Sequence, residues 1–237
     1  MDGRRVEHLL TTPTTPKELI SAESEGGTSF PNFLFFVLHK ERAHSERWNG
    51  PAPPKNPWRY RARTGMLFLM LIREATDADW PTIWAFFHPI VVAGETFTYP
   101  TDMDQDQARQ GWLLSKPDRT VVALDEHGTV VGTAKMNRNH MGNADHIASA
   151  SYMVDPAHNG RGVGRALCEY SLGWARQAGY TAMQFNAVVA TNTRAIGLYE
   201  SLGFAVVGTL ERGFRHPAHG HVGLRIMYRT LDEDPTR

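Results

Sequence analysis

The sequence is poor in cysteine: Cys168 is the only one among 237 residues. A single cysteine excludes an internal disulfide and leaves no set of thiolates that could hold a metal cluster. We therefore expect no metal site. Because so low a cysteine content is typical of proteins in a reducing compartment, we expect a cytoplasmic location.

The chain also lacks an excess of charge and long apolar runs. Its 25 basic residues balance 25 acidic residues. A balanced chain has no general attraction to nucleic acid or to an anionic membrane, so we expect neither as a partner. The most apolar early stretch, residues 33–38, is far shorter than the roughly 20 residues that a membrane-spanning helix needs. The first residues show no secretory leader pattern.

The first 65 residues differ in composition from the rest of the chain. Two clusters rich in proline and other turn-forming residues occur there, at residues 11–16 and 49–54. We expect residues 1–65 to be a poorly ordered N-terminal extension. Two alternatives remain open: a small docking segment, or a natural start at Met66, where a regular pattern begins.

From Met66 onward, apolar residues recur with the periods of strands and helices. Helices are expected from Thr76, at residues 103–114 and 162–177, and from Asn192. The order β-α-α-β-β-β-α-β-α-β-β predicts an α/β or α+β domain around one mixed sheet, over residues 66–231. Strands are expected at residues 67–72, 120–124, 129–136, 147–154, 182–189, 204–210 and 222–228.

A glycine-rich turn joins the strand at residues 147–154 to the helix that follows it. It reads Asn159-Gly160-Arg161-Gly162-Val163-Gly164. Glycines allow the backbone to come close to a ligand, and the start of a helix offers unpaired N–H groups at the positive end of its dipole. Arg161 and Arg165 add positive charge. The turn therefore predicts a site for phosphate groups.

Spacing distinguishes among the known phosphate-binding loops. The P-loop pattern G-x-x-x-x-G-K-[ST] does not occur in the chain. The dinucleotide pattern G-x-G-x-x-G requires an acid about 20 residues further on. The glycines here follow G-x-G-x-G, and residues 182–184 read Ala-Met-Gln where the acid would stand. Both nucleotide-loop interpretations are therefore disfavoured.

The spacing resembles the coenzyme A loop of the GNAT superfamily of N-acetyltransferases, which reads Gln/Arg-x-x-Gly-x-Gly/Ala. Asn159 stands where that family has glutamine or arginine. A second motif of the family follows at residues 192–204, which read N-T-R-A-I-G-L-Y-E-S-L-G-F. The resemblance covers residues 67–231 and is strongest to the phosphinothricin-acetyltransferase-like and amino-acid N-acyltransferase-like branch. It implies a mixed, mostly antiparallel central sheet flanked by helices.

The resemblance also implies acetyl-CoA as co-substrate and direct transfer of its acetyl group to a primary amine. The strand ending at Met153 and Val154 would bind the pantetheine arm, and a backbone N–H there would stabilise the oxyanion. A bulge in this strand would separate it from the strand at residues 182–189. The implied cofactor contacts are Met153, Val154, Asn159, Gly160, Arg161, Gly162, Val163, Gly164, Arg165 and Asn192.

Tyr199 is the residue that the resemblance assigns as general acid, because a phenol with a pKa of about 10 can protonate the departing thiolate. Cys168 is expected in the core. Several relatives use a glutamate as general base, and Ala148 occupies the matching position. The candidates that remain for the base are Glu95, Asp145, His146, His216 and His219.

The acceptor is expected to be a small molecule, such as an amino acid or a related amine. Glu95 and Asn186 are its expected contacts, and the bulky Trp84, Phe87 and Phe97 favour a closed acceptor pocket. Two other hypotheses remain: a non-catalytic acyl-CoA sensor, and acetylation of protein lysines or N-termini. Because dimers are common among relatives, the resemblance suggests a homodimer.

Overall fold

The computed structural model describes residues 58–61 and 69–231, which all lie within one compact unit, Ser45–Arg237. The expectations for residues 1–57 and for a start at Met66 fall outside the described residues. No helix in the described part of the chain is long and apolar enough to cross a membrane.

The described residues form one sheet of eight strands in the order β1-β2-β3-β4-β5-β6-β8-β7. Every neighbouring pair is antiparallel except β5 and β6, which are parallel. The expected mixed, mostly antiparallel sheet is therefore confirmed. The strands are β1 (Trp58–Arg61), β2 (Leu69–Glu74), β3 (Arg119–Leu124), β4 (Val130–Arg138), β5 (Ile147–Val154), β6 (Ala182–Val189), β7 (Ala205–His216) and β8 (Gly220–Thr230).

The first strand lies inside the stretch that was expected to be an extension. The backbone of β1 pairs with β2 from Trp58↔Ile72 to Arg61↔Leu69. A four-residue edge strand carries too short a pattern to be recognised in the sequence, because its position depends on the neighbouring strand rather than on its own periodicity. The sheet thus begins before the predicted domain boundary at residue 66.

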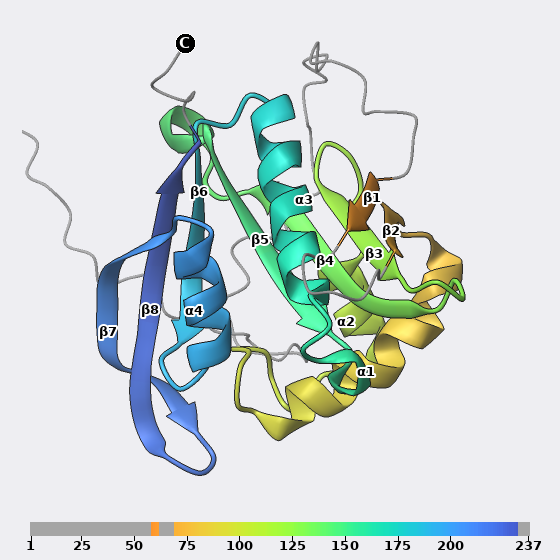
Figure 1. Cartoon of the computed structure of the whole chain (residues 1–237). Coiled ribbons are helices and arrows are strands. Elements are labelled where there is room, and N and C mark those ends of the chain that lie inside the picture. Colours follow the sequence, from red (N-terminus) through yellow and green to blue (C-terminus); the bar gives the residue numbers. More distant parts are fainter. Residues whose placement is uncertain (1–57, 62–68, 232–237) are drawn as a thin grey trace, which may run out of the picture. The chain divides into compact units, whose positions relative to one another are not determined.

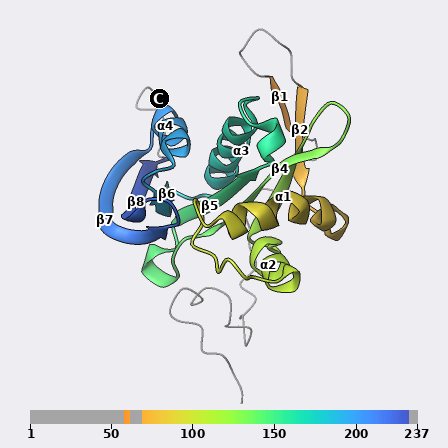
Figure 2. The same ribbon diagram turned by 90° about the horizontal axis from the view of Figure 1, so that it is seen from below.

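Two helices cover each face of the sheet (Figure 1, Figure 2). α3 (Val163–Gln177) and α4 (Thr193–Ser201) pack on one face, whereas α1 (Trp80–Ala93) and α2 (Gln105–Trp112) pack on the other. All four helices occur where the sequence predicts them. Short 3-10 turns precede α1, β5 and α3, at Asp77–Asp79, Gly142–Ala144 and Pro156–His158.

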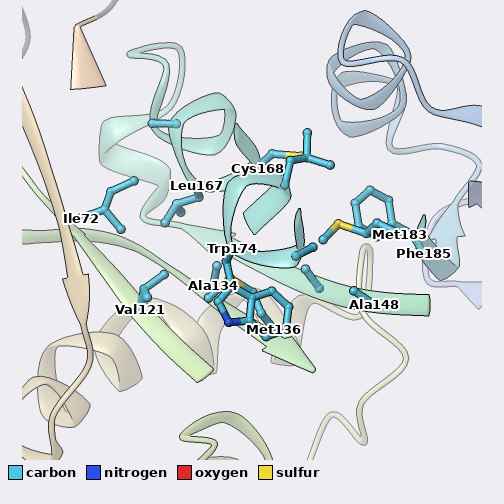
Figure 3. Packing of buried hydrophobic residues seen from close by; sticks show 14 of the residues in the cluster. Ile72, Val121, Ala134, Met136, Ala148, Leu167, Cys168, Trp174, Met183 and Phe185 are labelled. Carbon is cyan, nitrogen blue, oxygen red and sulfur yellow. The ribbon is translucent and has the colours of Figure 1, made fainter. Parts of the chain in front are cut away.

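The core between α3 and the sheet fixes the position of α3 and therefore of its N-terminus. Leu167 and Cys168 on α3 are fully buried, as are Ala134 and Ala148 on the strands beneath them (Figure 3). Burial raises the pKa of the Cys168 thiol to about 12. The expectation that Cys168 belongs to the core is confirmed, and so high a pKa leaves no thiolate for nucleophilic chemistry.

The last two strands are longer than the sequence predicts. β7 and β8 continue to the hairpin turn and pair as far as His216↔Gly220, whereas the expected strands end at residue 210 and begin at residue 222. The prediction was wrong because most of β7 is exposed at the edge of the sheet. An exposed hairpin keeps its backbone pairing without an alternation of apolar and polar side chains.

Gly132 on β4 allows α3 to lie close to the sheet. A Cβ at this position would lie 2.7 Å from Cγ1 of Val163 and 3.2 Å from the main-chain oxygen of Met153. We expect Gly132→Ala to lower the free energy of unfolding, measured in urea, by about 1–3 kcal/mol. Gly173→Ala is the control, because an added Cβ there has nothing within 4 Å. This change in a helix interior should raise stability by roughly 0.5–1 kcal/mol. Wild-type stability of Gly132→Ala would contradict the close packing.

An ion pair stabilises the start of α1. Asp79 is buried and accepts from both terminal nitrogens of Arg73, at 2.7 and 2.8 Å, and from the Thr76 N–H at 2.7 Å. The Arg73 hydrogen bonds lower the pKa of Asp79 from 3.8 to about 2. The stabilising effect is therefore complete above pH 4 and is lost as the pH falls through 2.

We expect Asp79→Asn to reduce the urea midpoint at pH 7, and the deficit relative to wild type to shrink progressively between pH 4 and pH 2. Asp77→Asn is the matched control, because the Asp77 side chain is 83% exposed and pairs only with Arg109. Its effect should be small, since exposed ion pairs contribute little. A deficit for Asp79→Asn that is independent of pH would contradict the ion-pair account.

Candidate functional site

The parallel strands β5 and β6 separate soon after they begin. They pair only at Ile147↔Ala182 and Ala148↔Met183. The expected separation is confirmed, but its expected cause is not. The register of β4 and β5 is continuous, whereas a bulge interrupts the pairing of β6 with β8 between Phe185 and Val188. The irregular strand is therefore β6, and β5 keeps a regular edge.

The free edge of β5 presents a defined set of backbone groups. Asp155 N–H donates to Val131 at 3.0 Å, and Ile147 C=O accepts from Asn139 at 2.8 Å. In an antiparallel ladder, hydrogen-bonded pairs alternate, so the odd-numbered residues of β5 face β4. Among them is Met153, whose N–H is directed at β4 rather than at the opening.

The even-numbered residues of β5 face the opening toward β6. These are Ala150, Tyr152 and Val154, which lie beyond the last β5–β6 pair. Val154 therefore presents its backbone as expected, but Met153 does not, because the register of the ladder turns it away. Tyr152 was missed, and nothing in its local sequence reveals which way its N–H points.

The glycine turn follows directly from β5. Gly160 has φ 82° and Gly162 has φ 84°, which are left-handed conformations that favour glycine. Gly162 is the N-cap of α3, and the first helical bond runs from Ala166 N–H to its carbonyl at 3.0 Å. The N–H groups of Val163, Gly164 and Arg165 thus have no acceptor within the helix.

The end of the turn lies against the free edge of β5. A Cβ on Gly164 would lie 3.7 Å from Cγ2 of Val154 and 3.5 Å from Cδ2 of Leu198 on α4. The helix start, the free strand edge and α4 therefore meet at one place. An extended ligand with a phosphate group at one end could hydrogen-bond to β5 and reach the helix N-terminus.

The arginines near the turn have different surroundings. Arg161 is exposed, but Arg165 donates to Ser201 of α4 at 2.6 Å and pairs with Glu169 at 3.6 Å. Arg194 of α4 was not singled out, although it lies within the second motif. Its Nη2 would lie 3.8 Å from a Cβ on Gly160. Arg194 thus supplies positive charge at the turn.

Asn159 and Asn192 have simple local roles. Asn159 is exposed and follows the 3-10 turn in an extended conformation. The Asn192 Oδ1 accepts from the Ala195 N–H at 3.2 Å, which confirms the expected N-cap of α4. This cap orients the helix that carries Tyr199.

Two tyrosines lie close together between α3, α4 and the sheet. The rings of Tyr152 and Tyr199 are 6.1 Å apart, and the Tyr199 ring is 4.5 Å from that of Phe185. Burial raises the pKa of both tyrosines well above their usual 10. Both phenols therefore carry a proton at neutral pH.

Only one of the two hydroxyls is committed to a protein partner. Ser171 Oγ donates to the Cys168 carbonyl at 2.8 Å, so in the 2.5 Å contact between Tyr152 and Ser171 the tyrosine must donate. Among the residues that the structure describes, no side chain or backbone group pairs with the Tyr199 hydroxyl. Tyr199 therefore has the available phenolic proton.

The opposite face of β5 carries small polar side chains. Ser149 and Ser151 alternate with Ala148 and Ala150, which are buried against α3. Ala148, the position matched to the glutamate base of relatives, therefore points into the core. Because β5 has no bulge that would turn this position to the other face, a longer side chain at position 148 would also point toward α3 and not toward an acceptor.

The candidate bases lie in different parts of the structure. Asp145 and His146 precede β5 at the end far from the glycine turn, and Asp145 pairs with Arg138 at 3.7 Å. Tyr152 follows His146 by six positions along the chain, about 20 Å in an extended strand. The ring centres of His216 and His219 lie 4.6 Å apart at the turn of the β7–β8 hairpin, and the rings are tilted by 40°. Glu95 is exposed in the segment after α1.

Asn186 borders the opening between β5 and β6. Its Nδ2 donates to Asn139 Oδ1 at 2.6 Å, and its Oδ1 accepts from Gln184 Nε2 at 2.7 Å. These bonds hold the Asn186 amide in one orientation. Among the described residues, no group of three or more His, Cys, Asp or Glu side chains is arranged to hold a metal ion.

Comparison with solved structures supports this geometry. A GCN5-related N-acetyltransferase from Kribbella flavida is 51% identical, with a TM-score of 0.66, over 68% of this chain and 97% of that chain. YncA from Salmonella typhimurium, solved with its cofactor acetyl-CoA, is 27% identical, with a TM-score of 0.59, over 71% of this chain and 97% of YncA. At least one relative of the same fold thus binds acetyl-CoA.

Two curated relatives match 46% and 60% of this chain. N-acetyltransferase aca1 of Schizosaccharomyces pombe is 32% identical over 111 residues, 46% of this chain and 53% of aca1. The chain therefore spans about half the length of that relative. The L-methionine sulfoximine/L-methionine sulfone acetyltransferase of Salmonella typhimurium is 31% identical over 151 residues, 60% of this chain and 84% of that enzyme.

The model of the acetyltransferase (GNAT) family matches residues 81–204, just over half of the chain. The match includes the free edge of β5, the glycine turn and Tyr199. The chain therefore belongs to the GNAT family of acetyltransferases.

Proposed function

We propose that this chain transfers the acetyl group of acetyl-CoA directly to the primary amine of a small molecule, such as an amino acid or a related compound. The observation that carries the proposal is the meeting of the free β5 edge with the N-terminus of α3. Backbone N–H groups of β5 and of the start of α3 have no partner in the sheet or in the helix there. Gly164 lies against Val154, so the two sets of donors are adjacent.

The residues of this site fit acetyl-CoA. Val154 and Tyr152 would hold the pantetheine arm through their backbones. The N–H groups of residues 162–165, together with Arg161 and Arg194, would hold the phosphates. When bound, acetyl-CoA supplies an acetyl group activated as a thioester.

Two groups of this chain would assist the transfer. The Tyr152 N–H points into the opening and would donate a hydrogen bond to the carbonyl oxygen as negative charge develops on it. The Tyr199 hydroxyl, held protonated by burial, would donate its proton to the sulfur that leaves. No side chain needs to form a covalent bond, in agreement with the buried, protonated Cys168.

The acceptor would approach from the face of the sheet that carries α1 and α2. Ser149, Ser151 and Asn186 point to this face, and Glu95 lies in the segment between the two helices. A relative named for L-methionine sulfone supports a small amino-acid-like acceptor. Glu95 and Asn186 remain our proposed acceptor contacts, and the homodimer and the cytoplasmic location remain predictions.

Gly162→Ala tests the cofactor site. A side chain at φ 84° is strained and would displace the free N–H groups. We expect affinity for coenzyme A, measured by calorimetry, to fall at least about tenfold, the equivalent of 1.4 kcal/mol. Gly179→Ala is the control, since Gly179 has φ 80° at the other end of α3 and an added Cβ there meets nothing within 4 Å. Equal binding of coenzyme A by both variants would contradict the proposed phosphate site at the N-terminus of α3.

Tyr199→Phe tests the proton donor. We expect kcat to fall about 10²-fold or more with coenzyme A affinity unchanged, because only the leaving thiolate loses its proton source. Tyr180→Phe is the control, since the Tyr180 ring packs against Trp174, 5.3 Å away, at the C-terminal end of α3 and away from the opening. Thiol release from acetyl-CoA measures the rate over a panel of amines and peptides.

The same panel distinguishes the alternative functions. Wild-type protein that binds acetyl-CoA but acetylates nothing would be a sensor, and acetylation of peptides alone would indicate a protein acetyltransferase.

A further inference from the structure

Lys135 on β4 is a partly buried cation without an acidic partner. Its Nζ donates to the Gly111 carbonyl at 2.9 Å and forms no ion pair within the described part of the chain. It lies 5.5 Å from the centre of the Tyr99 ring and 5.4 Å from that of Trp112. Burial raises the pKa of Asp118, and the charge of Lys135 opposes that rise, but the two side chains form no ion pair in the described part of the chain.

The register of the sheet places this cation beside the opening. Lys135 is directly opposite Ser151 on β5. Asn186 lies on β6 beyond the last β5–β6 pair, and its amide donates to Asn139 at 2.6 Å. All three side chains point to the face that carries α1 and α2. Lys135 therefore lies beside Ser151, which precedes Tyr152, the residue whose N–H faces the opening.

The surroundings of Lys135 suit a carboxylate. An ammonium has three donors, and the Gly111 carbonyl uses one of them. The rings of Tyr99 and Trp112 lie within cation–π distance of the ammonium, and its partial burial strengthens its attraction for an anion. The neighbouring Ser151 brings hydrogen-bonding capacity and carries no negative charge.

We propose that Lys135 binds the carboxylate of the acceptor, so that the acceptor is an amino acid whose amine and carboxylate are adjacent. This inference rests on the proposed acetyl transfer to a small amine. A carboxylate on Lys135 extends over Ser151, which places a neighbouring amine toward the opening between β5 and β6. Lys135 is thus a specificity-determining residue, and its bond to Gly111 at the end of α2 also fixes its position.

The test compares acceptors that differ only in the carboxyl group. The pairs are L-leucine with isopentylamine, L-methionine with 3-(methylthio)propylamine, and L-phenylalanine with phenethylamine. We expect the wild type to prefer the amino acid of at least one pair. Lys135→Met should raise KM for that amino acid by about 10- to 100-fold, the range for a hydrogen bond to a charged group. The kcat/KM of the paired amine should change less than about threefold.

Two control variants separate binding from folding. Lys135→Arg retains the charge and should restore part of the preference for the amino acid. Lys116→Met removes an exposed lysine before β3 and should leave both acceptors unaffected. If Lys135→Met weakens the amino acid and the amine equally, Lys135 only supports α2 and the proposal is wrong. A wild-type preference for the amines would also overturn it.

Binding without turnover distinguishes failure of this inference from failure of the proposed function. Calorimetry measures the binding of N-acetyl-L-methionine and N-acetyl-L-phenylalanine to the complex of the protein with coenzyme A. Binding to the wild type that Lys135→Met weakens at least about tenfold supports the carboxylate site even if no acceptor is turned over. Absence of binding to the wild type, in a protein that binds coenzyme A, rules the site out.

Discussion

The arrangement of the whole site depends on the short pairing between β5 and β6. Two parallel strands normally satisfy each other's backbone groups along their full length, but here only two residue pairs form. The backbone groups of β5 beyond Ala148 are then available to a ligand, and a buried backbone group needs a partner. The bulge in β6 lets that strand follow β8 while β5 stays in register with β4. The opening is therefore built by one irregular strand next to one regular strand.

The other parts of the site follow from the position of this free edge. β5 leads directly into the glycine turn, so the N-terminus of α3 necessarily lies at the end of the open edge. The close contact of Gly132 with Val163 keeps α3 against the sheet, and the buried face of α3 fixes its direction. α4 brings Tyr199 and Arg194 from the other side of the opening. One face of the sheet thus supplies the cofactor contacts and the proton donor, whereas the opposite face carries Ser151, Lys135 and Asn186.

This division between faces explains why the fold determines the binding of the cofactor more strongly than the binding of the acceptor. The cofactor side uses backbone N–H groups and a helix end, which depend on fold and on a few glycines. The acceptor side uses side chains, and its character comes from residues that are distant in the sequence. Lys135 faces Trp112 and Tyr99 only because α2 packs over β4, and Asn186 bonds to Asn139 only in the folded chain, since 47 residues separate them in the sequence. The family membership therefore constrains the donor more than it constrains the acceptor.

The sequence by itself determined the order of the elements, the glycine turn, the N-cap at Asn192 and the buried position of Cys168, because local periodicity and turn chemistry depend on neighbouring residues. It could not reveal that Met153 turns its N–H toward β4 while Tyr152 turns its own toward the opening, because this choice is set by the register of a ladder. It also placed the bulge in the wrong strand and missed β1, since both depend on strand partners. The partnerships of Lys135 and Arg194 likewise arose only in the tertiary structure, where side chains far apart in the chain come together.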